Sequence, residues 1–206
     1  MPGPSAAALR VVAAVAVLLG TLLGPSMAWA IPFDLSGDDW EGASELVRLA
    51  KAELEPGHVV TTNQIDFSEL KPEDGLLLIY PERSLDETEL SKFMRAGGRV
   101  VLLDDYGRGD SLLTAFNMHR VPAPRSPAES LRHNPQLALA EPASAHPVVA
   151  DVSRVVTNHP VGLQHPDLSA VLKIRSNNRE PDVTIAVAGA VGQGRQRFAR
   201  DAHVLR

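Results

Sequence analysis

Apolar residues recur at helical spacing over residues 40–54. They lie on one face of a helix that is predicted to start near Asp39, with Asp38 as its N-cap. The residues of this face are Trp40, Ala43, Leu46, Val47, Ala50 and Leu54. Pro56-Gly57 ends the helix, and Val59-Val60 predicts a short strand after it.

Two continuous apolar runs follow, GLLLIY at 75–80 and RVVLLD at 99–104. Runs that are apolar at every position are typical of parallel strands covered on both faces. Ser84 and Glu87 have the spacing of a capping box, which predicts a helix between the two strands. Strand, helix and strand in this order predict a right-handed βαβ unit.

Glycines mark the predicted end of the helix and the loop after the second apolar run. Gly97-Gly98 predicts a left-handed end of the helix between the two apolar runs. After the second run comes the loop DDYGRGD at 104–110, and its last residue, Asp110, is predicted to cap one more short helix.

Prolines dominate the stretch from 121 to 147, which we interpret as a surface excursion. The chain then becomes strand-like at 155–157, 170–174 and 183–187. Two of these strands would extend the parallel sheet. The expected fold is therefore α/β, a flavodoxin-like parallel sheet flanked by helices, in one domain with an interruption.

The N-terminal segment has the pattern of a secretory signal peptide. Arg10 precedes an uncharged run over 11–27, and Ala28-Trp29-Ala30 has the small residues of a signal peptidase site. We predict a signal peptide at 1–30, cleavage after Ala30, and export to the periplasm or cell envelope. An uncleaved membrane anchor is the alternative, because 11–30 is just long enough to span a bilayer.

The C-terminal residues break the pattern. A glycine turn at 192–195 should lead into an apolar strand, yet QRFARDAHVLR at 196–206 is charged and aperiodic. This predicts a domain over 31–195 followed by an atypical tail at 196–206. The sheet of that domain would be incomplete at its C-terminus. A fragment without independent function is accordingly one interpretation.

The charge of the chain restricts the classes of binding partner, and its lack of cysteine restricts the chemistry available to it. The formal net charge is −5 with both signs interspersed, which argues against nucleic acid and anionic lipid surfaces as partners. The sequence has no cysteine, so disulfides and thiolate chemistry are excluded. No cofactor is expected.

Three stretches carry a resemblance to a known family: GLLLIYPERSLDETELSKFMRAGGRVVLLDDYGRGDSLL, HPVVADVSRVVTNHPVGL and VAGAVGQGR. On these, the chain resembles the bacterial domain-of-unknown-function family "four-three-five-zero", in the class I glutamine amidotransferase-like group of flavodoxin-like domains. The resemblance implies an envelope domain that commonly carries a membrane anchor. The expected link to the membrane is therefore an uncleaved N-terminal segment or a missing C-terminal anchor. The nucleophile of that group is a cysteine, which this chain lacks, so no catalytic residue is carried over.

The loop after the second apolar run is the candidate ligand site, because ligands of such sheets bind at the carboxyl ends of the strands. Its residues are Asp104, Asp105, Gly107, Arg108 and Gly109. Glycine amides and the Arg108 guanidinium would hold an anion. Against this, a capped glycine-rich connection explains the same residues, and no metal site is predicted.

Two classes of function follow. The leading hypothesis is a non-catalytic envelope domain that binds a protein partner or small ligand through its strand-end loops and the proline-rich excursion. The alternative is a divergent hydrolase that uses Asp104, Asp105 and a histidine such as His159. Ser111 lacks the setting of a strained nucleophile and is expected in the first turn of a helix.

Overall fold

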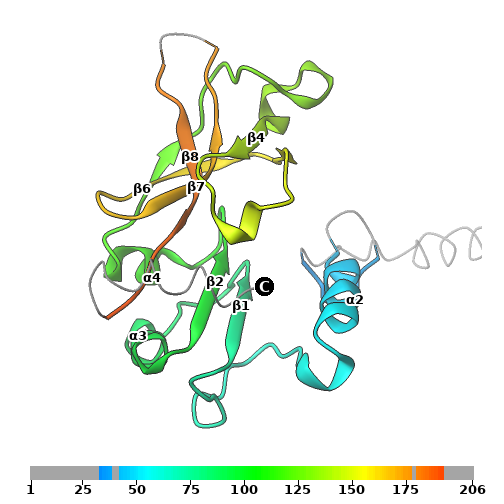
Figure 1. Ribbon diagram of the computed structural model, residues 1–206, viewed down its shortest axis with the longest axis vertical. Helices are drawn as coiled ribbons and strands as arrows, with labels where there is room; N and C mark the ends of the chain where they lie inside the picture. Colours follow the sequence, from blue (N-terminus) through cyan, green and yellow to red (C-terminus); the bar gives the residue numbers. More distant parts are fainter. Residues whose placement is uncertain (1–32, 39–41, 178–179, 193–206) are drawn as a thin grey trace, which may run out of the picture. The chain divides into compact units, whose positions relative to one another are not determined.

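Figure 1 shows a computed structural model of the chain, which describes residues 33–38, 42–177 and 180–192. The chain divides into two compact units, Met1–Thr62 and Asn63–Arg206. The predicted signal peptide at 1–30 and the tail at 196–206 lie outside the described residues, so both stay predictions. Among the residues that are described, no helix is both long and apolar enough to cross a bilayer.

The first unit contains the predicted N-terminal helix in a shorter form. Helix α2 spans Ser44–Glu53, and Asp38 accepts a hydrogen bond from the Ser44 hydroxyl at 2.6 Å. The expected start at Asp39 lies outside the described residues. A 3₁₀ turn, η1 (Pro56–His58), follows. The strand predicted at Val59-Val60 is wrong, since Val60 is 85% exposed and two apolar residues without a neighbouring strand have no ladder to join.

The second unit begins with the predicted strand, helix and strand. Strand β1 (Gly75–Ile79) and strand β2 (Arg99–Leu103) pair in parallel, with Gly75 opposite Arg99, and helix α3 (Glu87–Ala96) connects them (Figure 1). Parallel strands need a crossover of about a dozen residues or more, which the helix supplies. The parallel pairing is therefore confirmed.

The ends of α3 show one correct and one incorrect prediction. The helix ends at Gly97, whose φ of 124° is left-handed, as expected. The predicted capping box is wrong, because the side chain of Asp86 caps the helix and accepts from the amides of Thr88 and Glu89. Asp86 lies closer to the first turn than Ser84, and its carboxylate also favours the positive helix end.

Within the described residues of the second unit, the parallel strands are covered on one face. Leu90 and Phe93 of α3 are buried. On the strands, alternate residues remain open: Leu77 is 47% exposed, Val101 50% and Leu103 47%. The expectation of burial on both faces, drawn from the continuous apolar runs, is therefore wrong for the residues that the structure describes.

The rest of the second unit is antiparallel. Strand β3 pairs with β6, and a four-stranded sheet has the order β5-β4-β7-β8. The strands are β3 (His119–Pro122), β4 (Leu139–Pro142), β5 (Val155–Val156), β6 (Val161–Gln164), β7 (Ser169–Ile174) and β8 (Val183–Ala188). The helical elements are α4 (Asp110–Ala115) and three 3₁₀ turns, η2 (Leu131–His133), η3 (Pro135–Leu137) and η4 (Pro147–Val149).

The predicted flavodoxin-like parallel sheet flanked by helices is therefore wrong. The described residues contain one parallel pair, β1 and β2, and the later strands do not extend it. The reason lies in the connections after α4, whose described residues include no helix long enough for a parallel crossover. Short connections such as the one between β7 and β8 bring successive strands together in antiparallel order.

The proline-rich excursion is part of the antiparallel layer. It contains the last two residues of β3, the turns η2 and η3, all of β4 and the first residue of η4, and it contributes Ala138 and Ala140 to the core. These two alanines pack with Ile174 of β7, which is fully buried, and with the partly buried Leu172 and Ile185. The small side chains at 138 and 140 let the excursion lie close to β7.

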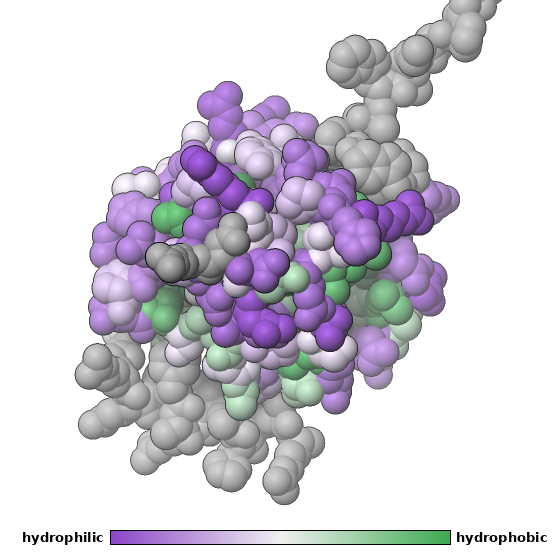
Figure 2. Space-filling model, turned by 90° about the horizontal axis from the view of Figure 1, so that it is seen from above, coloured by the Kyte–Doolittle hydropathy of each residue, from purple (hydrophilic) through white to green (hydrophobic). Residues whose placement is uncertain are grey.

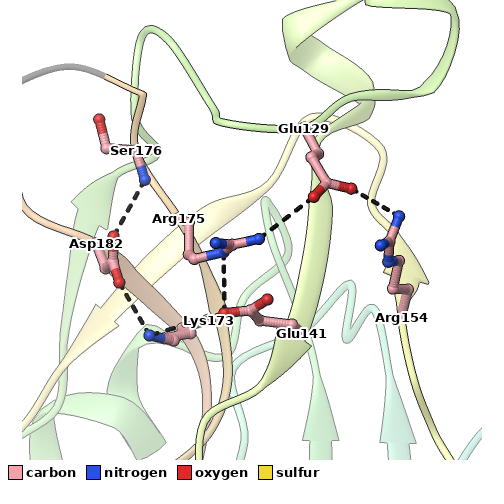
Figure 3. A network of polar contacts seen from close by, with 7 residues as sticks. All are labelled: Glu129, Glu141, Arg154, Lys173, Arg175, Ser176 and Asp182. Carbon is pink, nitrogen blue, oxygen red and sulfur yellow. Dashed lines mark hydrogen bonds and ion pairs between the residues drawn. The ribbon is translucent and has the colours of Figure 1, made fainter.

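A ladder of alternating charges crosses the polar face of this sheet, and we call it the charge ladder (Figure 3). Its members in order are Arg154, Glu129, Arg175, Glu141, Lys173 and Asp182. Glu141 on β4 stands opposite Lys173 on β7, so the strand register itself places acid against base. The contacts range from 2.6 Å for Arg154–Glu129 to 3.8 Å for Lys173–Glu141.

The Asp182 end of the ladder makes stability depend on pH. The Lys173 ammonium at 3.0 Å, followed by the Ser176 amide, holds the pKa of Asp182 below its ordinary value. A lowered carboxylate pKa stabilises the fold above the unfolded pKa of about 3.9, and this stabilisation is lost as the pH falls through the lower, folded value.

We therefore expect Asp182→Asn to cost less than about 1 kcal/mol at neutral pH, because the pair is exposed, and to reduce the loss of stability on acidification below about pH 4. Urea unfolding at a series of pH values measures both effects. Asp151→Asn, at an exposed position without an ion pair among the described residues, is the control. Equal acid slopes for wild type and Asp182→Asn would contradict the prediction.

Candidate functional site

The candidate site is the loop at 104–110, where β2 ends, and we call it the strand-end loop. Asp104 is its buried centre, with a side chain that is 0% exposed. The Asp104 carboxylate accepts from the amides of Gly107 at 2.5 Å and Gly109 at 2.7 Å. The amides of Gly107 and Gly109, which were predicted to bind an external anion, thus donate to a carboxylate of the same loop.

Arg120, on β3, clamps this loop from the neighbouring sheet. Its Nη2 lies 2.8 Å from Asp104 Oδ2, and its Nη1 donates to the Asp105 carbonyl. Its Nε is 3.1 Å from Asp110 Oδ1, an ion-pair distance without hydrogen-bond alignment. One guanidinium therefore holds the beginning and the end of the loop, which restricts the conformations of everything between them.

The glycines are required by the close approach of Asp104. A Cβ at position 107 would stand 2.5 Å from Asp104 Oδ1 and 3.0 Å from the Pro81 carbonyl oxygen. At position 109 it would meet the same carboxylate and stand 2.9 Å from Leu102 Cδ2. Both glycines are therefore explained by packing around a buried carboxylate.

Two strained residues flank the loop. Tyr80 has a φ of 44° and His159 a φ of 50°, and each directly precedes a proline. The left-handed region is unfavourable for side chains other than glycine, and a following proline disfavours helical conformations further. Both flanks touch the loop: Arg108 N donates to the Pro81 carbonyl at 2.7 Å, and the Tyr106 hydroxyl donates to the His159 carbonyl at 3.2 Å.

The loop presents a polar and aromatic surface to solvent. Tyr106 is 63% exposed, and Arg108 and His159 are also exposed. Asp105 is half-buried, and its Oδ1 accepts from the amide of Tyr106 at 2.8 Å. Of the five predicted residues, Arg108 is the most open to a ligand, while Asp104, Gly107 and Gly109 form the interior of the loop.

Two further residues were considered from the sequence, Ser111 and His159. Ser111 lies in the first turn of α4, as expected, and its hydroxyl donates to the Leu85 carbonyl at 3.3 Å. The backbone of His159 is beside the loop through its contact with Tyr106. No group of three or more metal-binding side chains that could hold an ion occurs among the residues described.

Sequence reasoning missed Tyr106 and Arg120. Tyr106 stands inside the predicted loop, and the signal that could have singled it out is a lone aromatic between glycines and charges. Arg120 comes from a segment that was not predicted to be a strand, and it reaches Asp104 across 16 positions of sequence. Nothing in the local pattern marks that pairing.

Fold and site together define an α+β protein, in which a parallel strand pair carries a clamped glycine loop beside antiparallel sheets. The chain belongs to the family described as a domain of unknown function, DUF4350, which it matches over residues 36–205. No curated protein and no solved structure matches it. This confirms the family named by the resemblance, but not its placement among amidotransferase-like proteins.

Proposed function

We propose that this chain is an exported, non-catalytic domain that binds a protein partner at the cell envelope through its strand-end loop. The observation that carries the proposal is the use of Asp104 and the glycine amides inside the loop. The groups with catalytic or anion-binding chemistry hold the loop in shape. What the loop offers outward is Tyr106 and Arg108 on a rigid support.

The chemistry of these exposed groups favours a protein partner over a small ligand. Tyrosine and arginine are enriched among the residues that contribute most to protein interfaces, because each combines a large contact area with a directional polar group. A small ligand would need a concave site, and strand-end loop residues line neither of the two best-defined clefts in the described part of the chain. The strain at Tyr80 and His159 supports a functional role for this edge.

The hydrolase alternative retains two residues, Asp105 and His159. Asp104 is removed from it, because a fully buried carboxylate engaged by Arg120 and two amides has no path to a substrate. Asp105→Asn and His159→Ala test what remains. Under the proposal, the purified protein does not hydrolyse ester, amide or glycoside substrates. A hydrolytic activity of the wild type that both variants lose would overturn it.

Export is supported by the pattern at 1–30, and a relationship with the class I glutamine amidotransferase-like superfamily is supported only by the β1–α3–β2 unit and by the quoted stretches. The measurement for export is the intact mass of the protein recovered from envelope and cytoplasmic fractions. A chain starting at Ile31 in the envelope fraction is expected, and an uncleaved chain in the cytoplasm contradicts export.

Partner binding is tested by photo-crosslinking in cells. A photoreactive residue at Glu82, which is exposed and adjacent to Pro81, is expected to give a discrete adduct in the envelope fraction. Tyr106→Ala and Arg108→Ala should each reduce the yield of that adduct at least about tenfold, because interface energies concentrate in such residues. The control position is Asp151, also exposed. An adduct that forms equally at both positions, or that ignores both variants, contradicts the proposal.

A further inference from the structure

A cleft on the antiparallel layer forms a second candidate site. It shares no lining residue with the strand-end loop. It measures about 610 Å³ and is lined by the excursion residues Arg125 to Ser130, by His133, and by Arg154 and Asn177. Ligand sites in proteins typically have volumes of about 300–1,000 Å³. None of the strand-end loop residues lines it, so the cleft does not depend on the function proposed above.

The cleft meets the charge ladder at its cationic end. Both oxygens of Glu129 are engaged, Oε2 by Arg154 at 2.6 Å and Oε1 by Arg175 at 3.3 Å. Arg154 is 59% exposed and uses only Nη1 for Glu129; its other N–H donors have no partner among the described residues (Figure 3). The charge ladder thus ends at the guanidinium of Arg154, which lines the cleft and has N–H donors that are not engaged by the described residues.

A second cation stands on the cleft wall. The side chain of Arg125 is exposed and makes no ion pair within the described residues, while its amide donates to Glu180 Oε2 at 3.2 Å. That carboxylate limits the positive charge at the rim. The space-filling view from above shows a mostly hydrophilic face with scattered hydrophobic residues (Figure 2).

The loop that carries His133 is strained. Arg132 and His133 have φ values of 52° and 58°, two successive left-handed residues, neither of them glycine. A bridge between Ser130 and Ala138 closes this loop, and the His159 amide donates to the Gln136 carbonyl at 2.8 Å. Each left-handed residue is unfavourable by roughly 1–2 kcal/mol, and such strain concentrates at ligand sites.

We propose that this cleft binds a carboxylate group, with Arg154 as the primary donor and Arg125 as the second cation. A guanidinium fork matches a carboxylate in two parallel hydrogen bonds. The ladder already pairs guanidinium groups with carboxylates through single contacts, in Arg175–Glu141 and Arg154–Glu129. The ligand continues the alternation of charge by one member. An acidic peptide segment and a small organic acid present the same group, and the experiment separates them.

The test is calorimetric titration of the full chain with two probes: a capped hexapeptide of alternating glutamate and serine, and citrate. The glutamine version of the peptide is the uncharged control. We expect saturable binding of at least one probe, weakened at least tenfold by Arg154→Ala and only partly restored in Arg154→Lys, which keeps the charge without the fork.

The matched control variant is Arg48→Ala. Arg48 forms an equally short ion pair with Glu45, at 2.6 Å, and is 63% exposed, but it lies in the first unit. Binding should be unchanged in Arg48→Ala and in Tyr106→Ala. Saturation by the peptide alone assigns the carboxylate to a protein segment, and saturation by citrate alone assigns it to a small acid.

Three results overturn the inference: no saturation by either probe while the protein unfolds cooperatively, equal binding of the glutamine peptide, or equal loss in Arg154→Ala and Arg48→Ala. Cooperative unfolding of Arg154→Ala is measured alongside, so that a folding defect is recognised. Because Tyr106→Ala leaves this cleft intact, failure here and failure of the strand-end loop proposal are distinguishable.

Discussion

Asp104→Ala is expected to lower the free energy of unfolding by about 3 kcal/mol or more. The substitution removes a fully buried carboxylate and leaves Arg120, which is only 20% exposed, without its main counter-charge. It also leaves the amides of Gly107 and Gly109 without their acceptor. Buried donors and charges that lose their partner carry most of their desolvation cost into the folded state.

Denaturant unfolding with a double-mutant cycle measures this effect. Arg120→Met should also destabilise the protein, and the double variant should lose less than the sum of the two single losses, because the residues interact directly. Glu45→Ala, which breaks the exposed pair with Arg48, should cost far less. If Asp104→Ala costs no more than Glu45→Ala, the clamp does not stabilise the loop.

Ile174→Ala is the second large effect, with an expected loss of about 2–5 kcal/mol. Ile174 is fully buried in β7 and packs against Ala138 and Ala140 of the excursion. The alanines cannot fill the space that the isoleucine leaves, so the cavity term adds to the loss of apolar burial. The loss should also loosen the excursion, because β4 pairs with β7 at Ala140 and Ile174.

The midpoint and slope of urea unfolding report the stability, and hydrogen exchange of the amides at 138–141 reports the excursion. Val148→Ala is the control, since Val148 is 72% exposed and its truncation creates no cavity. A loss for Ile174→Ala close to that of Val148→Ala would show that this small core does not hold the antiparallel layer together.

The position of the candidate site could be predicted, but its internal chemistry could not. An apolar run followed by DDYGRGD marks the end of a strand and a glycine loop, and local pattern is sufficient for that. Which of the two aspartates is buried depends on Arg120, which approaches from β3. Charge pairs between segments that are distant in the sequence leave no periodic signal.

Burial was also beyond the local pattern. The runs at 75–80 and 99–104 predicted strands, which the structure has at 75–79 and 99–103, and their connecting helix correctly predicted parallel pairing. Their apolar character at every position suggested cover on both faces, yet Leu77, Val101 and Leu103 are about half exposed. The hydrophobicity of a side chain indicates which environment it favours, whereas its burial depends on which element packs against it.

The sequence by itself determined the β1–α3–β2 unit, the glycine that ends α3, and the place of the strand-end loop, since each depends on residues that are neighbours in the chain. Only the tertiary structure decided that the later strands are antiparallel, that Asp104 is clamped by Arg120, and that the charge ladder ends at an open cleft. These features join segments far apart in sequence, and their energies come from contacts that exist only after the chain has folded.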